Sequence, residues 1–241
     1  MSVVPRVQQQ AAYILHHRPF RDSSQILDVF SRDHGKLALV ARGSRGARSR
    51  LKGVLRPFLP LRLSWVQKSE MGTLTGAESA GAPLSLGGDV LMAGYYVNEL
   101  LLNFLHRHDP QPEIFDLYVD VLHELRGDKN TAAVLRRFEI VLLELLGYAL
   151  SFDHEAGGLS TLDPEANYEY RVEQGPVPVH RTEGALVFAG ATLTAVGQQN
   201  FDKGEVLRAA NRLLRHVISH HLGGKELKTR KVLADLHRRL N

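Results

Sequence analysis

The sequence predicts an α+β protein in two parts: a small five-stranded barrel over residues 1–81, then a mostly helical domain over residues 82–241. Three observations predict this class. The first 80 residues contain short runs of β-branched and alternating apolar side chains, which are typical of strands. Helical periodicity begins near residue 89. Gly and Pro residues between positions 81 and 88 separate the two patterns and mark the boundary.

The strand-like runs are short and closely spaced. Their turn signal is clearest at Asp33-His34-Gly35, where glycine can adopt a positive φ and join two runs in a hairpin. Five strands without a long helix predict a small closed or partly closed barrel; an OB-fold fits, and so do an SH3-like barrel and a sandwich. The expected strands cover residues 12–15, 24–30, 36–41, 58–66 and 71–77.

The helical part begins with Asp89 as the expected N-cap. A third helix, capped by Asn130 or Thr131, is apolar nearly all round, which is typical of the middle of a bundle. Residues 151–190 are rich in Gly and Pro and contain at most short strands at 168–172 and 185–188. The expected helices cover residues 89–105, 114–125, 131–146, 193–201, 203–221 and 226–240.

Composition excludes several functional classes. The chain of 241 residues is 44% hydrophobic and 23% charged, as in ordinary globular proteins. It has no Cys, which excludes disulfide frameworks, thiolate zinc sites, iron–sulfur clusters and cysteine nucleophiles. The N-terminal stretch lacks the apolar run of a signal peptide, and no apolar segment approaches the roughly 20 residues of a membrane span. We therefore expect a soluble, cytoplasmic protein.

Charge is distributed unevenly along the chain. Residues 1–80 carry a net charge of +8, residues 81–160 carry −7, and residues 161–241 carry +3. The formal total of +4 hides the basic excess of the first part. A local excess of this kind concentrates polyanions near one part of a surface.

The strongest polar feature is a basic stretch at residues 32–56, with eight cations and one acid, Asp33. Its middle, residues 41–50, contains mainly small residues and arginines, so we expect a mobile loop between the third and fourth strands. Arginine binds phosphate bidentately and stacks on bases. A solubilising loop is the alternative, but the charge ratio beside a barrel favours nucleic acid. The candidate DNA-binding residues are Arg32, Lys36, Arg42, Arg45, Arg48, Arg50, Lys52 and Arg56.

A second basic group follows Gly223-Gly224 and contains Lys225, Lys228 and Arg230. The glycines permit close backbone approach, and the N-terminus of the following helix offers free N–H groups to a phosphate. An ordinary last helix with a polar outer face has the same pattern, and the residues alone favour neither interpretation.

A third feature is the pair Arg136-Arg137 in the apolar third helix, with Ile140 and Val141 one turn further on. Cations beside apolar surface could hold a peptide that carries a carboxylate and an aromatic ring. Ion pairing with Glu139 or another acid is the alternative, and the residues alone favour that structural role.

Catalysis receives little support. The His pairs at 16–17, 106/108 and 220–221 lack the spacing of metal ligands on one face, and no nucleotide-binding, zinc-protease or serine-hydrolase motif is present. We expect no catalytic residue, metal or cofactor.

Taken in order, several short motifs resemble the bacterial recombination mediator family RecO. They include YILHHRPF at 13–20, DSS at 22–24, LDVF at 27–30, GKL at 35–37, ARG at 41–43 and LKG at 51–53, followed by PF at 57–58. In the helical part they are YYVNEL at 95–100, LRRFE at 135–139, LLGY at 145–148 and LGGKELKTR at 222–230. The resemblance spans almost the whole chain.

The resemblance implies an N-terminal OB-fold and a helical C-terminal domain. It implies a protein that binds single- and double-stranded DNA, anneals complementary strands and helps to load RecA, acting with RecR and with single-strand-binding protein (SSB), whose acidic tail ends in Phe. By position, it assigns Arg42, Arg50, Lys52 and Arg56 to DNA and Arg136 and Arg137 to the tail. Many relatives carry a cysteine zinc cluster; residues 152–159 here contain no Cys, so the chain resembles the zinc-free branch.

We therefore expect a non-enzymatic DNA-repair mediator associated with the nucleoid. The barrel and the C-terminal basic group would bind DNA, and Arg136, Arg137, Ile140 and Val141 would bind the SSB tail. The alternatives are an RNA-binding OB-fold protein of translation or RNA processing and, more distantly, a hydrolase with dispersed His and Asp residues.

Overall fold

The computed structural model describes residues 6–67, 69–84, 86–127, 129–158 and 160–232. The chain divides into two compact units. The first unit comprises residues 1–127 and 227–241, and the second comprises residues 128–226. In sequence, the second unit is therefore inserted between two segments of the first. Among the described residues, no helix combines the length and apolar character that crossing a membrane requires.

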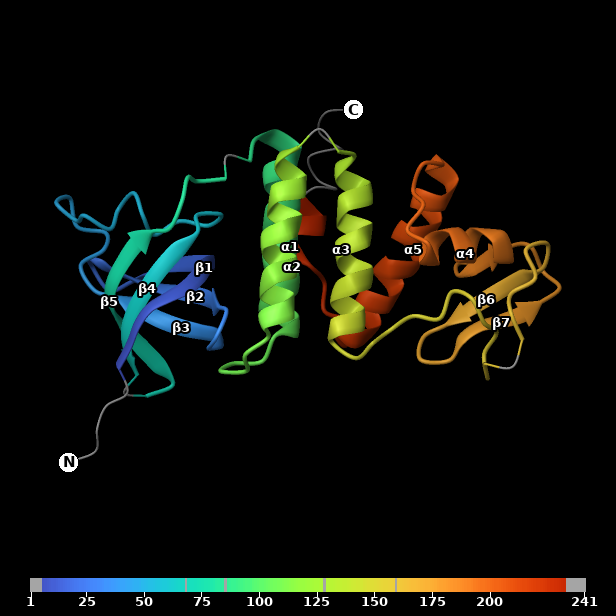
Figure 1. The fold of residues 1–241 in the computed structure, drawn as a ribbon, viewed down its shortest axis with the longest axis horizontal. Coiled ribbons are helices and arrows are strands. Elements are labelled where there is room, and N and C mark those ends of the chain that lie inside the picture. Colours follow the sequence, from blue (N-terminus) through green and yellow to red (C-terminus); the bar gives the residue numbers. More distant parts are fainter. Residues whose placement is uncertain (1–5, 68, 85, 128, 159, 233–241) are drawn as a thin grey trace. The chain divides into compact units, whose positions relative to one another are not determined.

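Five strands of the first unit form a closed barrel: β1 (Arg6–Phe20), β2 (Ser24–Ser31), β3 (Gly35–Ala41), β4 (Leu61–Gln67) and β5 (Met71–Ser79) (Figure 1). Their order around the barrel is β1-β2-β3-β5-β4, and β4 pairs back with β1. All pairs are antiparallel except β3 with β5. Closure with this strand order confirms the OB-fold among the barrel types that the sequence allowed.

Two strands, β1 and β4, differ from their predicted bounds by three or more residues at one end or both. β1 begins at Arg6 and runs to Phe20, well beyond the predicted 12–15, because it pairs with both β2 and β4 and has register shifts in both ladders. β4 begins at Leu61 instead of Phe58. Phe58 has a φ of +61°, which is incompatible with a strand, and its ring packs edge-on against Tyr95 at 5.2 Å.

The link between β3 and β4 contributes to the barrel core. Its backbone forms a series of turns, with hydrogen bonds such as Ser49 N–H to the Gly46 carbonyl. Leu55 and Leu59 are buried with the inward-facing side chains of the strands, and Leu51 and Val54 pack against them. The sequence predicts a mobile loop from the small and basic residues of 41–50; the apolar side chains that follow anchor this link to the barrel.

Helices α1 (Gly88–Phe104) and α2 (Pro112–Arg126) complete most of the first unit, and α1 packs against β1 and α2. The buried Asn98 joins all three elements: its amide donates to the Leu15 carbonyl at 2.9 Å and accepts from the Tyr118 hydroxyl at 2.8 Å. The prediction that Asp89 is the N-cap of α1 is wrong. Gly87 occupies the N-cap position, and Asp89 lies in the first turn, where its charge still complements the helix dipole.

The C-terminal segment of the first unit is held by Glu99 of α1. One carboxylate oxygen accepts from the backbone N–H of Lys228 at 2.8 Å, and the other accepts from the N–H and hydroxyl of Thr229 at 2.9 and 2.6 Å. Leu227 is buried beside this contact. Residues 228–232 are helical, in agreement with the start of the predicted helix 226–240; the remainder of that helix lies outside the described residues.

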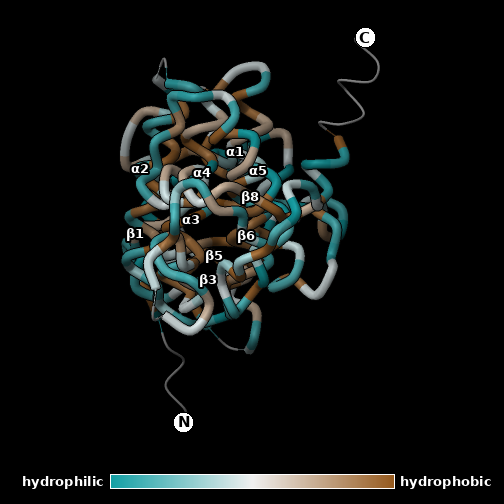
Figure 2. Tube along the Cα trace, turned by 90° about the vertical axis from the view of Figure 1, so that its right-hand side faces the viewer, coloured by the Kyte–Doolittle hydropathy of each residue, from teal (hydrophilic) through white to brown (hydrophobic). Residues whose placement is uncertain are grey.

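The second unit contains α3 (Thr131–Leu145), β6 (Asn167–Arg171), β7 (Gly175–Val179), β8 (Val187–Ala189), α4 (Gly190–Gly197) and α5 (Gly204–His221). Of the two residues that the sequence allowed as the cap of α3, the structure selects Asn130, whose side chain accepts from the N–H groups of Ala132 and Ala133. Apolar residues lie mainly inside the trace and hydrophilic residues mainly in its outer loops (Figure 2).

The sheet of this unit has the order β7-β6-β8, and the sequence did not predict β7. Pro176 and Pro178 argue against a central strand, but β7 is an edge strand, where proline is tolerated. Tyr168 and Tyr170 of β6 are buried on the inner face. Burial raises the pKa of the Tyr170 phenol.

We predict that Glu99→Ala releases the C-terminal segment. Loss of three hydrogen bonds to a carboxylate should lower the free energy of unfolding by about 1–3 kcal/mol. Amide hydrogen exchange at Lys228 and Thr229 should accelerate, because the N–H groups of both residues donate to the Glu99 carboxylate. Asp120→Ala is the control, because Asp120 is exposed on the neighbouring α2. Unchanged exchange at both amides in a folded Glu99→Ala variant would contradict this role.

Candidate nucleic-acid interface

A groove of about 500 Å³ lies on the barrel wall. It is bounded by the turn between β1 and β2, the end of β3, and the start of β5. In OB-folds, this combination of strand face and flanking loops binds extended nucleic acid. The described residues that line it include arginines, small polar residues and apolar side chains but no carboxylate: Phe20, Arg21, Ser23, Ser24, Val40, Arg42, Gly43, Ser69, Met71 and Thr73.

The apolar surface of the groove is assembled by the parallel pairing of β3 with β5. This pairing places Val40 opposite Thr73 and brings Met71 alongside β3. The side chain of Met71 is 38% exposed. Phe20 is half-buried at the end of β1. Phe20 and Met71 thus present apolar surface on which a nucleobase could stack.

The basic wall of the groove is fixed to the β1–β2 turn. Arg45 donates its backbone N–H to the Ser23 carbonyl at 2.8 Å, so the segment leaving β3 is attached to this turn. The Arg21 guanidinium lies 5.2 Å from the centre of the Phe20 ring. Arg21 has a φ of +54°, an uncommon conformation for a non-glycine residue and one often found at functional sites.

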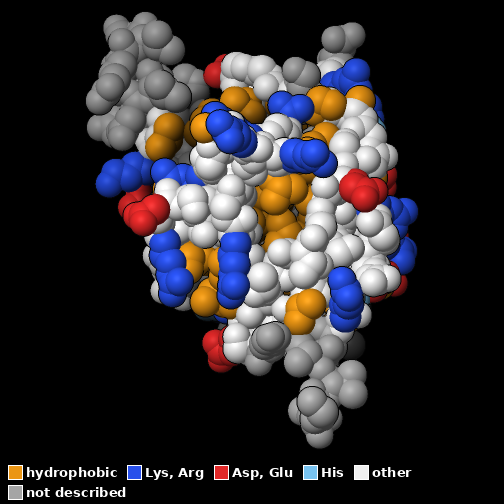
Figure 3. All heavy atoms as spheres, turned by 90° about the vertical axis from the view of Figure 1, so that its left-hand side faces the viewer, with side chains coloured by type: hydrophobic (Ala, Val, Ile, Leu, Met, Phe, Trp, Pro, Cys, Tyr) orange, Lys and Arg blue, Asp and Glu red, His pale blue; other side chains and the backbone are white. Residues whose placement is uncertain are grey.

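The rest of the basic stretch directs its charges outward from the barrel. Arg42, Arg45, Arg48, Arg50, Lys52 and Arg56 are exposed. In the view onto the barrel, Lys and Arg side chains surround an apolar hollow (Figure 3). Leu55 and Leu59 of this link are buried while its cations remain in solvent, so apolar burial in the barrel holds the positive charge in place.

Arg32 and Lys36 form hydrogen bonds to the helices of the first unit. The Arg32 guanidinium donates to both oxygens of Asp116 at 3.1 and 2.8 Å, and this hydrogen bond lowers the pKa of the Asp116 carboxyl. The Lys36 ammonium donates to the Leu102 carbonyl near the C-terminus of α1 at 2.7 Å. Both cations therefore support the packing of barrel and helices, and neither lines the groove.

Two members of the C-terminal basic group, Lys228 and Arg230, form contacts within the first unit. The backbone N–H of Lys228, which the sequence offers to a phosphate, donates to Glu99. The Arg230 guanidinium donates to the Tyr96 hydroxyl at 2.6 Å and lies 5.2 Å from the centre of that ring. Lys225 is exposed after the glycine pair. A carboxylate of the chain itself thus occupies the position proposed for an anion.

The two arginines of α3 have different environments. Arg136 is buried; its terminal nitrogens donate to Glu139 and to Asn211, each at 2.6 Å. This is the ion pair that the sequence offered as the structural alternative. Arg137 is half-buried, has no ion pair among the described residues, and lies 5.9 Å from the ring of Phe201. Ile140 and Val141 are half-buried one turn further on.

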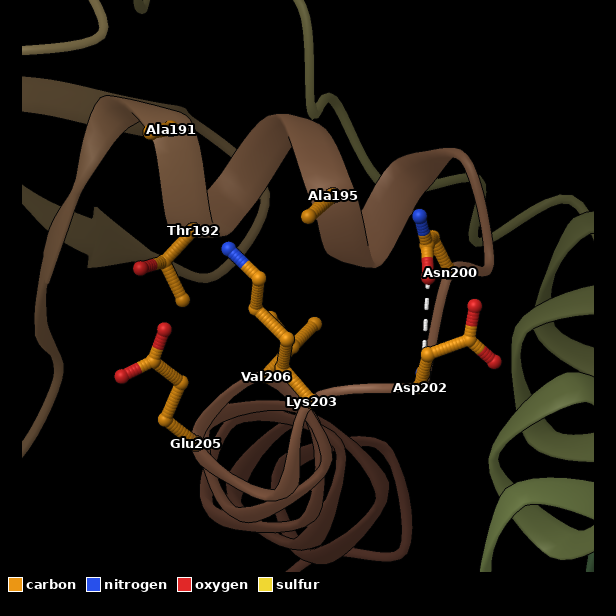
Figure 4. A pocket seen from close by; sticks show the side chains of 8 residues that line it. All are labelled: Ala191, Thr192, Ala195, Asn200, Asp202, Lys203, Glu205 and Val206. Carbon is orange, nitrogen blue, oxygen red and sulfur yellow. Dashed lines mark hydrogen bonds between the residues drawn. The ribbon is translucent and has the colours of Figure 1, made fainter.

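A hollow of about 250 Å³ lies within the second unit, between α4 and the start of α5 (Figure 4). Lys203 points between the two helices, but Asp202 and Glu205 lie on either side of it. Two carboxylates make this hollow unfavourable for a phosphate. Among the described residues, no group of three or more His, Asp and Glu side chains could hold a metal ion.

Sequence reasoning missed Phe20, Arg21 and Met71. Arg21 lies outside the dense run of cations, and Phe20 and Met71 belong to strand ends that are 51 positions apart in sequence. Only barrel closure brings them to one groove. The motif at residues 13–20, which ends at Phe20 and is followed by Arg21 in a turn, was the sequence signal that could have indicated these two groove residues.

Comparison with known proteins agrees with this architecture. Residues 1–82 match the family model for the N terminus of recombination protein O, and residues 87–231 match the model for its C terminus. The chain is 42% identical to the DNA repair protein RecO of Aromatoleum aromaticum, over 98% of this chain and 99% of that protein. It is 41% identical to the proteins of the same name from Azoarcus sp. and Dechloromonas aromatica, over the same shares. The chain therefore belongs to the RecO family of DNA repair proteins.

Proposed function

We propose that this chain is a non-enzymatic recombination mediator that binds single- and double-stranded DNA and anneals complementary strands. The observation that carries the proposal is the groove of the barrel, where apolar side chains and arginines meet without a carboxylate. Single strands are bound in this way, with bases on apolar or aromatic surface and phosphates on cations. Family membership supports a role in DNA repair.

The division of labour within the groove follows from its chemistry. Phe20 and Met71 offer stacking surface that accepts any base. Arg21 and Arg42 offer guanidinium groups for the phosphate backbone, and the exposed cations of the link extend the charge: Arg45, Arg48, Arg50, Lys52 and Arg56. Contacts that are mostly electrostatic let two strands shift until their bases find register. Annealing needs this freedom.

We further propose that the second unit recruits the mediator to DNA coated with SSB, and that RecR and RecA act in the same process. A tail peptide ending in acidic residues and Phe presents a carboxylate and a ring. Arg137 has hydrogen-bonding capacity for that carboxylate, with Ile140 and Val141 as apolar neighbours on the same face of α3. Arg136 supports this face through its pairing with Glu139.

The test of the proposed function is annealing of complementary DNA strands, bare and coated with SSB, without nucleotide hydrolysis. We expect acceleration of both reactions by the wild-type chain. A strong preference for structured RNA over DNA, with no annealing of DNA, would overturn the proposal and favour an RNA-binding role.

We predict that binding of single strands is strongly salt-dependent. If about five phosphates are neutralised, log affinity should fall with log salt at a slope near −3.5. The triple variant Arg45→Glu, Arg48→Glu and Arg50→Glu should flatten the slope toward about −1.5 and slow annealing. Arg126→Glu is the control, because Arg126 is exposed at the end of α2. An unchanged slope in the triple variant would place the site elsewhere.

Phe20→Ala should weaken single-strand binding without changing the salt slope. Loss of one base–aromatic stack costs about 1–3 kcal/mol, which is roughly a 5- to 150-fold loss of affinity. The slope stays constant because no phosphate contact is removed. Fluorescence anisotropy over a salt series, with circular dichroism to confirm folding, measures both quantities. Equal affinity for the variant and the wild type would exclude Phe20 from the interface.

The two α3 arginines should respond differently to substitution. Arg137→Glu should weaken binding of an SSB tail peptide about tenfold or more, because it removes a charge-assisted hydrogen bond, while bare strands should still anneal. Arg136→Ala should lower the free energy of unfolding by about 3–5 kcal/mol, because it leaves Glu139 buried without its cation. Arg137→Lys controls for charge alone. Normal peptide binding by a folded Arg137→Glu variant would place the tail site elsewhere.

A further inference from the structure

Helix α5 carries a row of arginines on its exposed face. Arg208, Arg212 and Arg215 lie at positions i, i+4 and i+7, so they share one stripe of the helix, and all three are exposed. The opposite face, with residues such as Leu213 and Val217, is buried. Residues 206–221 contain no Asp or Glu, although the second unit as a whole is rich in acids.

This α5 arginine row is poorly compensated by carboxylates. Among the described residues, Arg208 and Arg215 are exposed and form no ion pair or hydrogen bond. Arg212 donates to the Val187 carbonyl at 2.9 Å and lies 4.5 Å from the ring of Phe188, so the middle of the row is fixed to β8.

Among the described residues, no ion pair joins an acid to the row. Glu205 lies in the first turn of α5, three residues before Arg208, and Glu173 pairs with His220 at the other end of the helix. Glu169 of the sheet pairs with Arg171 and Arg181. Like charges at i, i+4 destabilise a helix slightly, so the row costs stability unless an anion binds to it.

The chemistry of the row fits a nucleic-acid backbone. Seven residues of helix span about 10 Å, which corresponds to about three phosphates of one strand. Guanidinium forks bind phosphate oxygens bidentately. The exposed large apolar side chains among the described residues are Met71, Tyr95, Tyr148 and Val232, and none lies on α5. An acidic peptide ending in an aromatic residue would find no exposed large apolar side chain on this face of α5, whereas a phosphate backbone needs only cations.

We infer that the α5 arginine row binds the phosphate backbone of a second nucleic-acid strand while the barrel groove holds the first. The inference rests on the proposed annealing function, since annealing requires one protein to hold two strands. Two sites in one chain raise the effective concentration of one strand near the other. The second unit thereby takes part in annealing itself as well as in recruitment.

The test uses the full chain and the double variant Arg208→Gln and Arg215→Gln, which spares Arg212 because of its contact with β8. The matched control is Arg171→Gln and Arg181→Gln, which removes the same charge from the same unit at arginines already paired with Glu169. With the protein saturated by one labelled strand, capture of a second, non-complementary strand is measured over a salt series.

We expect the α5 variant to bind the first strand within about twofold of the wild type. Capture of the second strand should fall about tenfold, and its salt slope should decrease in magnitude by about 1.4, as for two lost phosphate contacts. Annealing of bare strands should slow in parallel, and the control should behave as the wild type.

Second-strand capture equal to that of the control would overturn the inference while leaving the proposed function intact. Loss of SSB tail binding with unchanged capture of DNA would also overturn it and assign the row to an acidic peptide. If the wild-type chain neither binds nor anneals DNA, the proposed function itself fails, and the inference fails with it.

Discussion

The parallel pairing of β3 with β5 closes the barrel, and the groove depends on that closure. It sets Ala38 opposite Met71 and Val40 opposite Thr73. Between them Gly72 must stay small, because a Cβ there would lie 2.7 Å from Leu39 and 3.0 Å from Trp65. Since the side chains of a strand alternate between faces, the same three pairs send Leu39 into the core and leave Val40, Met71 and Thr73 on the groove side. Core packing and the groove wall therefore depend on the same strand pairing.

Anchoring explains how a chain can present many unpaired arginines without losing its fold. In the β3–β4 link, Leu55 and Leu59 enter the barrel core while Arg50, Lys52 and Arg56 stay in solvent. In α5, the apolar face is buried, and the arginine row lies on the opposite, exposed face of the helix. In both places burial of apolar surface offsets charge repulsion, and the cations remain available. The basic surface is therefore stabilised by the burial of apolar residues on the same segments.

Local patterns in the sequence were sufficient for most of the fold. The hairpin at Asp33-His34-Gly35, a helix cap at Asn130 or Thr131, and a barrel followed by a helical region each depend on neighbouring residues, and the structure confirms them, with Asn130 as the cap. The compact units divide after residue 127, not at the predicted boundary near residue 81. β7 tolerates its prolines because it is an edge strand. The positive φ of Phe58 delays the start of β4, although the sequence there has a strand-like pattern. Both features depend on tertiary context. The groove was beyond prediction for the same reason, because Phe20 and Met71 meet only through the strand order. The hydrogen bond from the Lys228 N–H to Glu99 could not be predicted either, since the two residues lie far apart in sequence.

Counting charges in sequence could not distinguish arginines that hold the protein together from those left for a partner. Arg136 and Arg137 are neighbours, yet one is buried against Glu139 and the other lies half-exposed over Phe201. Arg32 sits in the same basic stretch as Arg42, but Asp116 engages it, while Arg42 lines the groove. Burial and pairing make this distinction, because a cation with a carboxylate partner gains little from a phosphate, whereas an unpaired one gains a charge-assisted bond. The same criterion selects the α5 row, whose arginines no pattern in the sequence had singled out.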